Sequence, residues 1–231
     1  MKKTLYERLR AVTAAGASAA TVTRLADGAQ SLYDGERWEG VLVLTEGQQA
    51  AVRGMLVADR SGVLEGTEDL FVRAYARPPR LIVVGAAHIS QFLAPMAALA
   101  GFEVIVVDPR RAFASADRFP GVTLVDAWPD EAFANLNLDT TTAVVTLTHD
   151  PKIDDPALIA ALGSPVFYVG ALGSKRTHAK RIARLAEAGL AEKVGRIHAP
   201  VGLNLGGRAP REIAVSILAE VIQVRYRGEA D

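Results

Sequence analysis

The sequence contains no cysteine, few aromatic residues and no net charge. Among its 231 residues, aromatic residues make up 6%, and 26 Lys and Arg balance 26 Asp and Glu. The absence of cysteine excludes disulfides, zinc sites with thiolate ligands and cysteine nucleophiles. The neutral charge balance gives no global signal for nucleic acid or a membrane surface as a partner, so any positive field must be local.

Signals for secretion and membrane insertion are also missing. The first residues, MKKTLYERLRAV, contain two lysines but no apolar segment of the kind found in a secretory signal. No stretch approaches the roughly 18 uninterrupted apolar residues that a membrane-spanning helix needs. We therefore expect a cytoplasmic protein that does not enter a membrane.

The sequence pattern divides the chain into two parts. The first, residues 1–76, predicts a small α+β domain. Leu5, Leu9 and Val12 share one face of a helix that should end near Gly16. A second helix is expected at 48–58, and strands are expected at 21–25, 41–44 and 70–75. The two prolines in the segment 76–80 cannot continue a helix or a central strand, so this segment predicts a linker.

Residues 77–231 predict a Rossmann-like parallel sheet flanked by helices. Short apolar runs, typical of strands buried on both faces, alternate with helical segments. Strands are expected at 81–84, 104–107, 122–125, 143–147 and 166–169. Helices are expected at 92–99, 129–135, 155–162, 175–188 and 211–225, with Asp155 as the N-cap of its helix and Pro156 as the first helical residue. Ligands of such sheets bind beyond the carboxyl ends of the strands, so any binding or catalytic residues are expected in the loops there.

The loop after the first of these strands is an incomplete dinucleotide fingerprint. Gly85 fills the first position of G-x-G-x-x-G, but Ala87 replaces the second glycine, where backbone approaches a pyrophosphate. His88 follows at the expected start of a helix, whose N-terminus favours anions. A structural turn without a ligand is the alternative interpretation.

Asp108 ends the second strand, 23 positions after Gly85, close to the spacing of an acid that holds ribose hydroxyls. Arg110 follows and is a candidate for neutralising a phosphate, with a solvated loop charge as the alternative. After the fourth strand, Thr148, His149 and Asp150 lie in one loop. His149 is the candidate catalytic residue, as a general acid or base or as a hydrogen-bonding clamp.

The stretch after the fifth strand carries the most information. Gly170 and Gly173 allow the backbone to curl, and Ser174 is a plausible N-cap. Lys175 and Arg176 then place two cations in the first helical turn, where they oppose the helix dipole at a cost of a few tenths of a kcal/mol each. An anion bound between them would offset that cost. A basic helix start that faces water is the alternative.

The last loop is glycine-rich and contains His198, Gly202 and Asn204, which complete the candidate binding residues. The four histidines of the chain do not follow a metal-ligand spacing such as H-x-x-x-H, so no metal site is expected.

Four sequence blocks resemble, in order and spacing, the Rossmann domain of the XdhC/CoxI family over about residues 78–226. The blocks are GAAHISQFLAPMAALAGFEVIVVDPR, LTHDPKIDDPAL, FYVGALGSKRTHAKR and IHAPVGLNLGGRAPREIAVSILAEV. Members of this family are accessory proteins of molybdenum hydroxylases such as xanthine dehydrogenase. The resemblance implies binding of the molybdenum cofactor, support of its sulfuration and delivery to the apoenzyme.

The chain departs from the family pattern at several places. The family's N-terminal domain usually carries a Gly-Ser-Ser-Pro-Arg-like stretch and a Ser-Gly-Gly-Cys stretch, and residues 1–76 contain neither. The glycine loop is commonly G-A-G-H, whereas Ala87 stands here at the second glycine. The acidic residue of the family's G-L-D-I-G is Asn204 in this chain.

The sequence leaves three alternative hypotheses for the function of the chain. A maturation chaperone would bind the molybdenum cofactor or a related phosphate-bearing nucleotide. A Rossmann oxidoreductase would instead use NAD(P), and a scaffold would have lost its ligand. The resemblance favours the chaperone over an enzyme. It implies a molybdenum hydroxylase apoenzyme as the partner and leaves room for a cysteine desulfurase and a homodimer.

Overall fold

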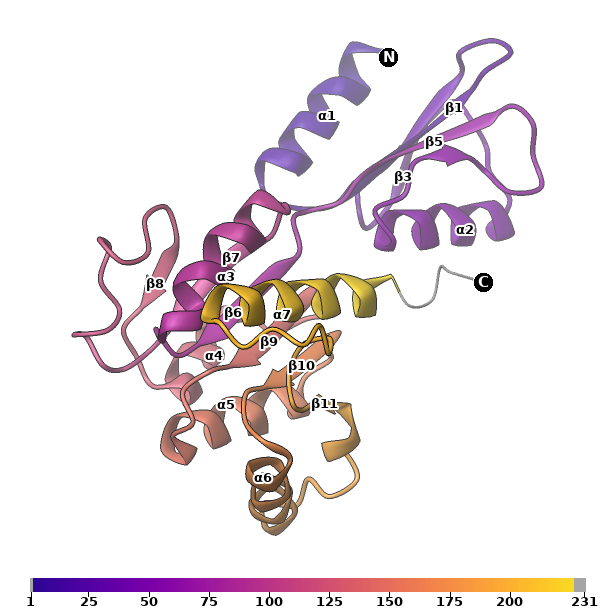
Figure 1. The fold of residues 1–231 in the computed structure, drawn as a ribbon. Helices are drawn as coiled ribbons and strands as arrows, with labels where there is room; N and C mark the ends of the chain where they lie inside the picture. The colour runs from indigo at the N-terminus through magenta and orange to yellow at the C-terminus, as the bar shows by residue number, and fades with distance from the viewer. Residues whose placement is uncertain (1, 227–231) are drawn as a thin grey trace. The chain divides into compact units, whose positions relative to one another are not determined.

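The computed structural model describes residues 2–226 (Figure 1). The chain divides into two compact units, Met1–Arg77 and Pro78–Asp231. None of the helices among the described residues is long and apolar enough to cross a membrane.

The N-terminal unit is built on one antiparallel sheet. Its helices are α1 (Lys3–Ala14) and α2 (Glu46–Val57). Its strands are β1 (Ala19–Arg24), β2 (Gln30–Tyr33), β3 (Trp38–Gly40), β4 (Gly62–Val63) and β5 (Leu70–Tyr75). The sheet order is β3-β2-β1-β5-β4, and all neighbouring strands are antiparallel.

The two helices of this unit pack on opposite faces of its sheet. The predicted apolar face of α1 is buried, and its residues Leu5, Leu9 and Val12 pack with Ala19 of β1. The next residue, Ala20, points to the other face and packs in a cluster with the buried side of α2. Alternation along one strand therefore serves two separate apolar layers.

One strand predicted in this unit is wrong. Residues 41–44 form no strand, although their burial alternates, with Leu42 and Leu44 buried and Val43 93% exposed. The backbone N–H and carbonyl of Leu42 are bound instead by the Ser31 hydroxyl, at 2.9 and 2.8 Å. Alternating apolar residues predict which side chains are buried, whereas a strand also needs a neighbouring strand that hydrogen-bonds its backbone.

The C-terminal unit is the predicted Rossmann-like domain. Its strands are β6 (Arg80–Val84), β7 (Glu103–Val107), β8 (Thr123–Val125), β9 (Thr142–Thr146), β10 (Tyr168–Ala171) and β11 (Ile197–His198). Its helices are α3 (His88–Leu99), α4 (Pro129–Leu136), α5 (Pro151–Gly163), α6 (Lys175–Glu187) and α7 (Pro210–Arg225), with a 3₁₀ turn at Val194–Arg196.

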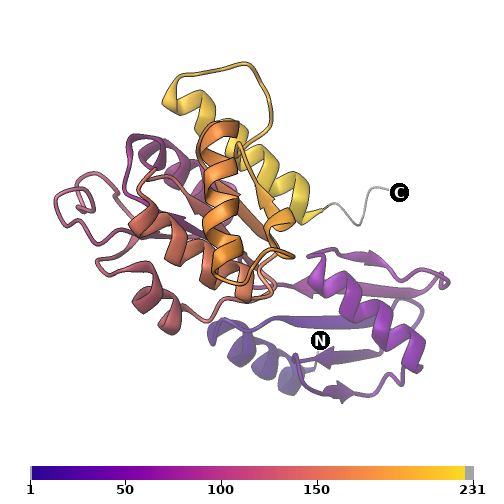
Figure 2. The same cartoon turned by 90° about the horizontal axis from the view of Figure 1, so that it is seen from below.

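The sheet of this unit is parallel, in the order β11-β10-β9-β6-β7-β8. Read from β8, this is the 3-2-1-4-5-6 order of dinucleotide-binding folds. The strands are added toward one edge from β6 to β8 and toward the other edge from β9 to β11, so the strand order reverses between β6 and β9. Helices α3 and α7 pack on one face, and α4, α5 and α6 pack on the other (Figures 1 and 2). The predicted fold class is confirmed.

The predicted start of α5 is wrong. Asp150 is the N-cap, its carboxylate accepts a hydrogen bond from the Lys152 N–H at 3.0 Å, and Pro151 is the first helical residue. Pro156 lies inside the helix, and Asp155 pairs with Arg184 of α6. The same Asp-Pro signal occurs at 150–151 and again five positions later at 155–156, and the first occurrence sets the helix start.

Candidate functional site

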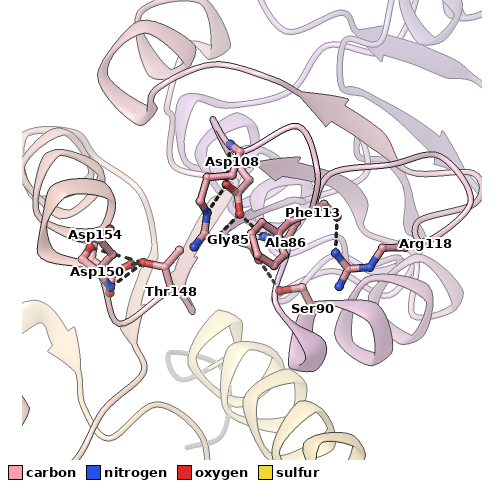
Figure 3. Close-up of polar contacts among 10 residues, drawn as sticks. Gly85, Ala86, Ser90, Asp108, Phe113, Arg118, Thr148, Asp150 and Asp154 are labelled. Atoms are coloured by element: carbon pink, nitrogen blue, oxygen red, sulfur yellow. Dashed lines mark hydrogen bonds and ion pairs between the residues drawn. The ribbon is translucent and has the colours of Figure 1, made fainter.

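Three loops meet at the carboxyl edge of the parallel sheet, where the strand order reverses (Figure 3). Gly85, at the end of β6, has φ of 107°, and a Cβ added there would overlap the methyl group of Thr148 in the loop after β9. Gly85 is therefore required both by its backbone conformation and by the close approach of the β9 loop. This edge is where ligands bind in open α/β sheets.

Asp108 is fully buried at this edge, and its carboxylate is hydrogen-bonded by neighbouring groups of the protein. Its carboxylate accepts hydrogen bonds from the N–H of Ala86 at 2.7 Å and from the Arg110 backbone at 2.9 Å. The Arg110 guanidinium binds both carboxylate oxygens, at 2.9 and 2.8 Å. Burial disfavours the charged carboxylate, but the hydrogen bonds from Arg110 and Ala86 outweigh it and keep the pKa of Asp108 below its ordinary value. A ribose hydroxyl would have to displace Arg110 to reach Asp108.

The loop after β9 is held together by Thr148. The Thr148 hydroxyl accepts a hydrogen bond from the Asp150 N–H at 3.0 Å and donates to Asp154 Oδ1 at 2.7 Å (Figure 3). His149, between them, is exposed and has φ of 66°, a left-handed conformation that is uncommon outside glycine. Asp150 therefore has a capping role, and His149 is presented toward solvent at this edge.

The two cations at the start of α6 have different surroundings. Ser174 caps the helix by accepting a hydrogen bond from the Thr177 N–H at 3.2 Å. Arg176 lines a cavity of about 260 Å³ between α5 and α6, whereas Lys175 is not among the described residues that line it. The lining residues are His149, Pro151, Asp154, Arg176, Thr177, Lys180, Arg181 and Arg184. The paired cations thus do not converge on one point, but His149 and Arg176 share one cavity.

Sequence reasoning missed the buried ion pair in this cavity, Arg181 and Asp154. Only 2% of Arg181 and 1% of Asp154 is exposed. The Arg181 Nη2 donates to the carbonyl of Leu172 at 2.8 Å and lies 3.6 Å from Asp154 Oδ2. A sequence signal existed, because Arg181 lies one helical turn before the buried Leu185 and so places a cation on the apolar face of α6.

The pair is only partly satisfied. Arg181 Nε and Nη1 and Asp154 Oδ2 have no hydrogen-bond partner among residues 2–226. Burial raises the pKa of Asp154 despite the Thr148 hydrogen bond and the charge of Arg181, and burial lowers the pKa of Arg181. Unsatisfied buried groups of this kind need an explanation, and a bound ligand is one.

Other predicted residues gather at a different place, under the α3–α7 layer. Glu220 of α7 is bound by the Tyr168 hydroxyl, by His198 Nδ1 at 3.1 Å and by the Gly202 N–H at 2.8 Å. The rings of Tyr168 and His198 stack at 4.6 Å. Burial, together with the Glu220 hydrogen bond, raises the pKa of Tyr168. This cluster holds the last loop against α7.

The remaining predicted residues lie outside both clusters or serve packing. A Cβ on Gly170 would meet Val201 at 2.6 Å, so this glycine is required by packing. Gly173 has φ of 141° just before the Ser174 cap. His88 is exposed and hydrogen-bonds Gln91 at 3.1 Å, and Asn204 is exposed. Within residues 2–226 no group of three or more His, Asp or Glu residues could hold a metal ion.

Comparison with known proteins assigns the family. Residues 81–221, more than half of the chain, match the XdhC Rossmann domain. The chain belongs to the XdhC family. This confirms the resemblance carried by the four sequence blocks.

Curated relatives of this XdhC chain are similar over its C-terminal two-thirds. A probable xanthine dehydrogenase component of Bacillus subtilis is 35% identical over 162 residues, which are 70% of this chain and 47% of that protein. The "Molybdenum cofactor insertion chaperone PaoD" of Escherichia coli is 37% identical over 153 residues, 66% of this chain and 42% of that protein. The matched segments thus make up less than half the length of these relatives.

A solved structure shares the fold of this XdhC chain. The crystal structure of a xanthine dehydrogenase from Bacillus halodurans superposes with a TM-score of 0.75 at 24% sequence identity. The superposition covers 99% of this chain and 64% of the other. The likeness supports the observed fold.

Proposed function

We propose that this chain is an accessory protein in the maturation of a molybdenum hydroxylase, with the molybdenum cofactor or a related phosphate-bearing nucleotide as its cargo. The observation that carries the proposal is the match of residues 81–221 to the XdhC Rossmann domain, because this segment supplies every loop at the carboxyl edge of the sheet. A relative named as a molybdenum cofactor insertion chaperone aligns over a similar share of the chain.

The role of the chain would be binding and delivery, while the chemistry stays with the cargo. The loop after β9 and the start of α6 offer cations for a phosphate. Because the chain contains no cysteine, it has no thiol with which to carry sulfur. Sulfuration of the cargo would therefore draw its sulfur from a partner such as a cysteine desulfurase.

The state of Asp108 supports this proposal over an NAD(P)-dependent oxidoreductase. Its carboxylate is occupied by Arg110 and Ala86, so it is not free for a ribose. Ala87 adds a methyl group where the fingerprint has its second glycine. We expect NAD and NADP to bind weakly or not at all and to support no turnover.

The test is retention and transfer of released molybdenum cofactor. The chain is incubated with cofactor freed from a molybdenum hydroxylase, passed over a sizing column and then mixed with the matching apoenzyme. We expect the cofactor to co-elute with the chain and to restore activity to the apoenzyme. Loss of all cofactor on the column, or tight NAD(P) binding with turnover, would overturn the proposal. The elution volume also tests whether the chain is a homodimer.

A further inference from the structure

We propose that the cavity between α5 and α6 binds a phosphate monoester group, with Arg181 at its inner end and Arg176 and Lys180 at its rim. The proposal names the part of the cargo that the chain holds, and it rests on the proposed function for its biological meaning. It differs from the dinucleotide position at Gly85, because the cavity lies between two helices on one face of the sheet.

Arg181 is the observation that points to a ligand. It lines the cavity and is 2% exposed, yet Nε and Nη1 have no hydrogen-bond partner among the described residues. Leaving guanidinium donors buried and unpaired is costly, and phosphate oxygens are acceptors that bind a guanidinium through charge-assisted hydrogen bonds. A buried arginine that only stabilised the fold would be expected to have its donors satisfied.

The charge of the cavity fits a dianion. Arg184 is engaged by both carboxylate oxygens of Asp155 on α5. That leaves Arg176, Lys180 and Arg181 against the single carboxylate of Asp154, an excess of about two positive charges. A phosphate monoester carries about −1.5 to −2 near pH 7, so it would balance this excess.

The size and shape of the cavity favour a terminal group. Its volume of about 260 Å³ is below the roughly 300–1,000 Å³ of pockets that enclose a drug-sized ligand. The buried Arg181 and Asp154 close its inner end, whereas Arg176 and Lys180 are exposed. A terminal monoester has one substituent and can enter from one side, while the diphosphate bridge of a dinucleotide has a substituent at each end.

The hollow between α4 and α5 provides an internal contrast. It is larger, at about 690 Å³, but Asp130 is the single ionisable residue among its described lining residues. That surface has no cation among its described lining residues for an anion to contact. Of these two hollows, the α5–α6 cavity is the one whose chemistry matches a phosphate.

The experiment titrates the full chain with inorganic phosphate, AMP and NAD at constant ionic strength, followed by ³¹P NMR. The test variant is Arg176→Ala with Lys180→Ala, and the matched control is Arg53→Ala with Lys193→Ala. The control removes the same charge from exposed positions outside the cavity. We expect saturable binding of phosphate and AMP to the parent and the control, and affinity at least about 100-fold lower in the test variant.

Arg181→Lys tests the inner end. It keeps the positive charge but removes the guanidinium, so phosphate affinity should fall by about 10-fold or more. If Arg181→Lys fails to fold, the test variant at the rim of the cavity, Arg176→Ala with Lys180→Ala, still tests whether the cavity binds phosphate. It is called the rim variant below. Absence of saturable phosphate binding to the parent, or equal affinity in the test and control variants, overturns the site. NAD binding that is lost in the rim variant overturns the monoester assignment in favour of a diphosphate.

The phosphate titration is independent of the molybdenum cofactor, so the two proposals can fail separately. Phosphate binding without cofactor retention leaves the cavity assigned and removes the proposed cargo. Cofactor retention that is unchanged in the rim variant leaves the accessory role and removes the cavity from it.

Discussion

Each of the two units contains a buried aspartate close to an arginine of a helix distant in sequence, and these two carboxylates, Asp34 and Asp154, differ in how completely they are hydrogen-bonded. Asp34 of the N-terminal unit is 8% exposed and accepts hydrogen bonds from the N–H groups of Glu36 and Arg37 and from the Arg8 side chain. Asp154 of the C-terminal unit is 1% exposed, and one of its oxygens has no hydrogen-bond partner among residues 2–226.

The pKa values of these two carboxyl groups shift in opposite directions. The Arg37 N–H and the Arg8 guanidinium outweigh burial and hold the pKa of Asp34 well below its ordinary value. Burial raises the pKa of Asp154. A buried charge that is fully hydrogen-bonded stabilises the fold, whereas one left partly unsatisfied is where the proposed phosphate would supply the missing partners.

The largest expected effect is on Asp34. Asp34→Ala removes the acceptor for two backbone N–H groups and for Arg8, so we expect the N-terminal unit to lose about 2–4 kcal/mol of unfolding free energy. Denaturant unfolding of the full chain measures this loss. A loss below about 1 kcal/mol would mean that Asp34 is no better satisfied than Asp154.

Acid should act through the same residue. Because the pKa of Asp34 is lower in the folded state than its unfolded value near 4, its stabilisation is present above about pH 4 and is lost as the pH falls further. We expect the thermal midpoint of the N-terminal unit to drop below about pH 4. Asp34→Asn should flatten this drop, and an unchanged pH profile in that variant would contradict the assignment.

Asp154→Asn should have a small effect on the fold. The raised pKa of Asp154 means that burial of its charge costs more than Thr148 and Arg181 offset. A neutral amide removes that cost but leaves Arg181 without its counter-charge, so the two effects oppose each other and we expect stability to change by no more than about 1 kcal/mol. The same change removes a negative charge from the cavity and should tighten phosphate binding. A loss of roughly 3–5 kcal/mol, as for a complete buried pair, would contradict the comparison.

The smallest effect is expected from separating the units. The chain divides between Arg77 and Pro78, and each side has its own apolar clusters. We propose that these units are separable domains and expect a chain that begins at Arg77 to unfold cooperatively with its midpoint nearly unchanged. Aggregation or a broad transition would place the boundary elsewhere.

Most of the fold was predictable because its signals are local. Continuous apolar runs predict strands buried on both faces, as in β6, β7 and β9. The helical spacing of Leu5, Leu9 and Val12 predicts a helix buried on one face. Strands such as β4 and β11, with two residues each, are too short to show a period, and they exist through their partners in the sheet.

The candidate site was predictable only in part. The loops after the strands predicted His149 and Arg176 as candidate binding residues, and both line the cavity between α5 and α6. The position of Arg181 on the apolar face of α6 signals that it is buried, but its pairing with Asp154 joins two helices, and no local pattern identifies that partner. The state of Asp108 was also hidden, since a spacing cannot show whether Arg110 already occupies a carboxylate.

Thr148 places unusual restrictions on substitution at this edge. Its methyl group lies against Gly85, and its hydroxyl binds Asp154. Serine would keep the hydrogen bond and leave a hole against the glycine, while valine would fill the space and strand the carboxylate. Any replacement of Gly85 by a larger residue needs a smaller residue at 148. Gly85 and Thr148 are therefore coupled by contact, and Thr148 and Asp154 by a hydrogen bond, so redesign of what this edge of the sheet accepts has to consider the three positions as one set.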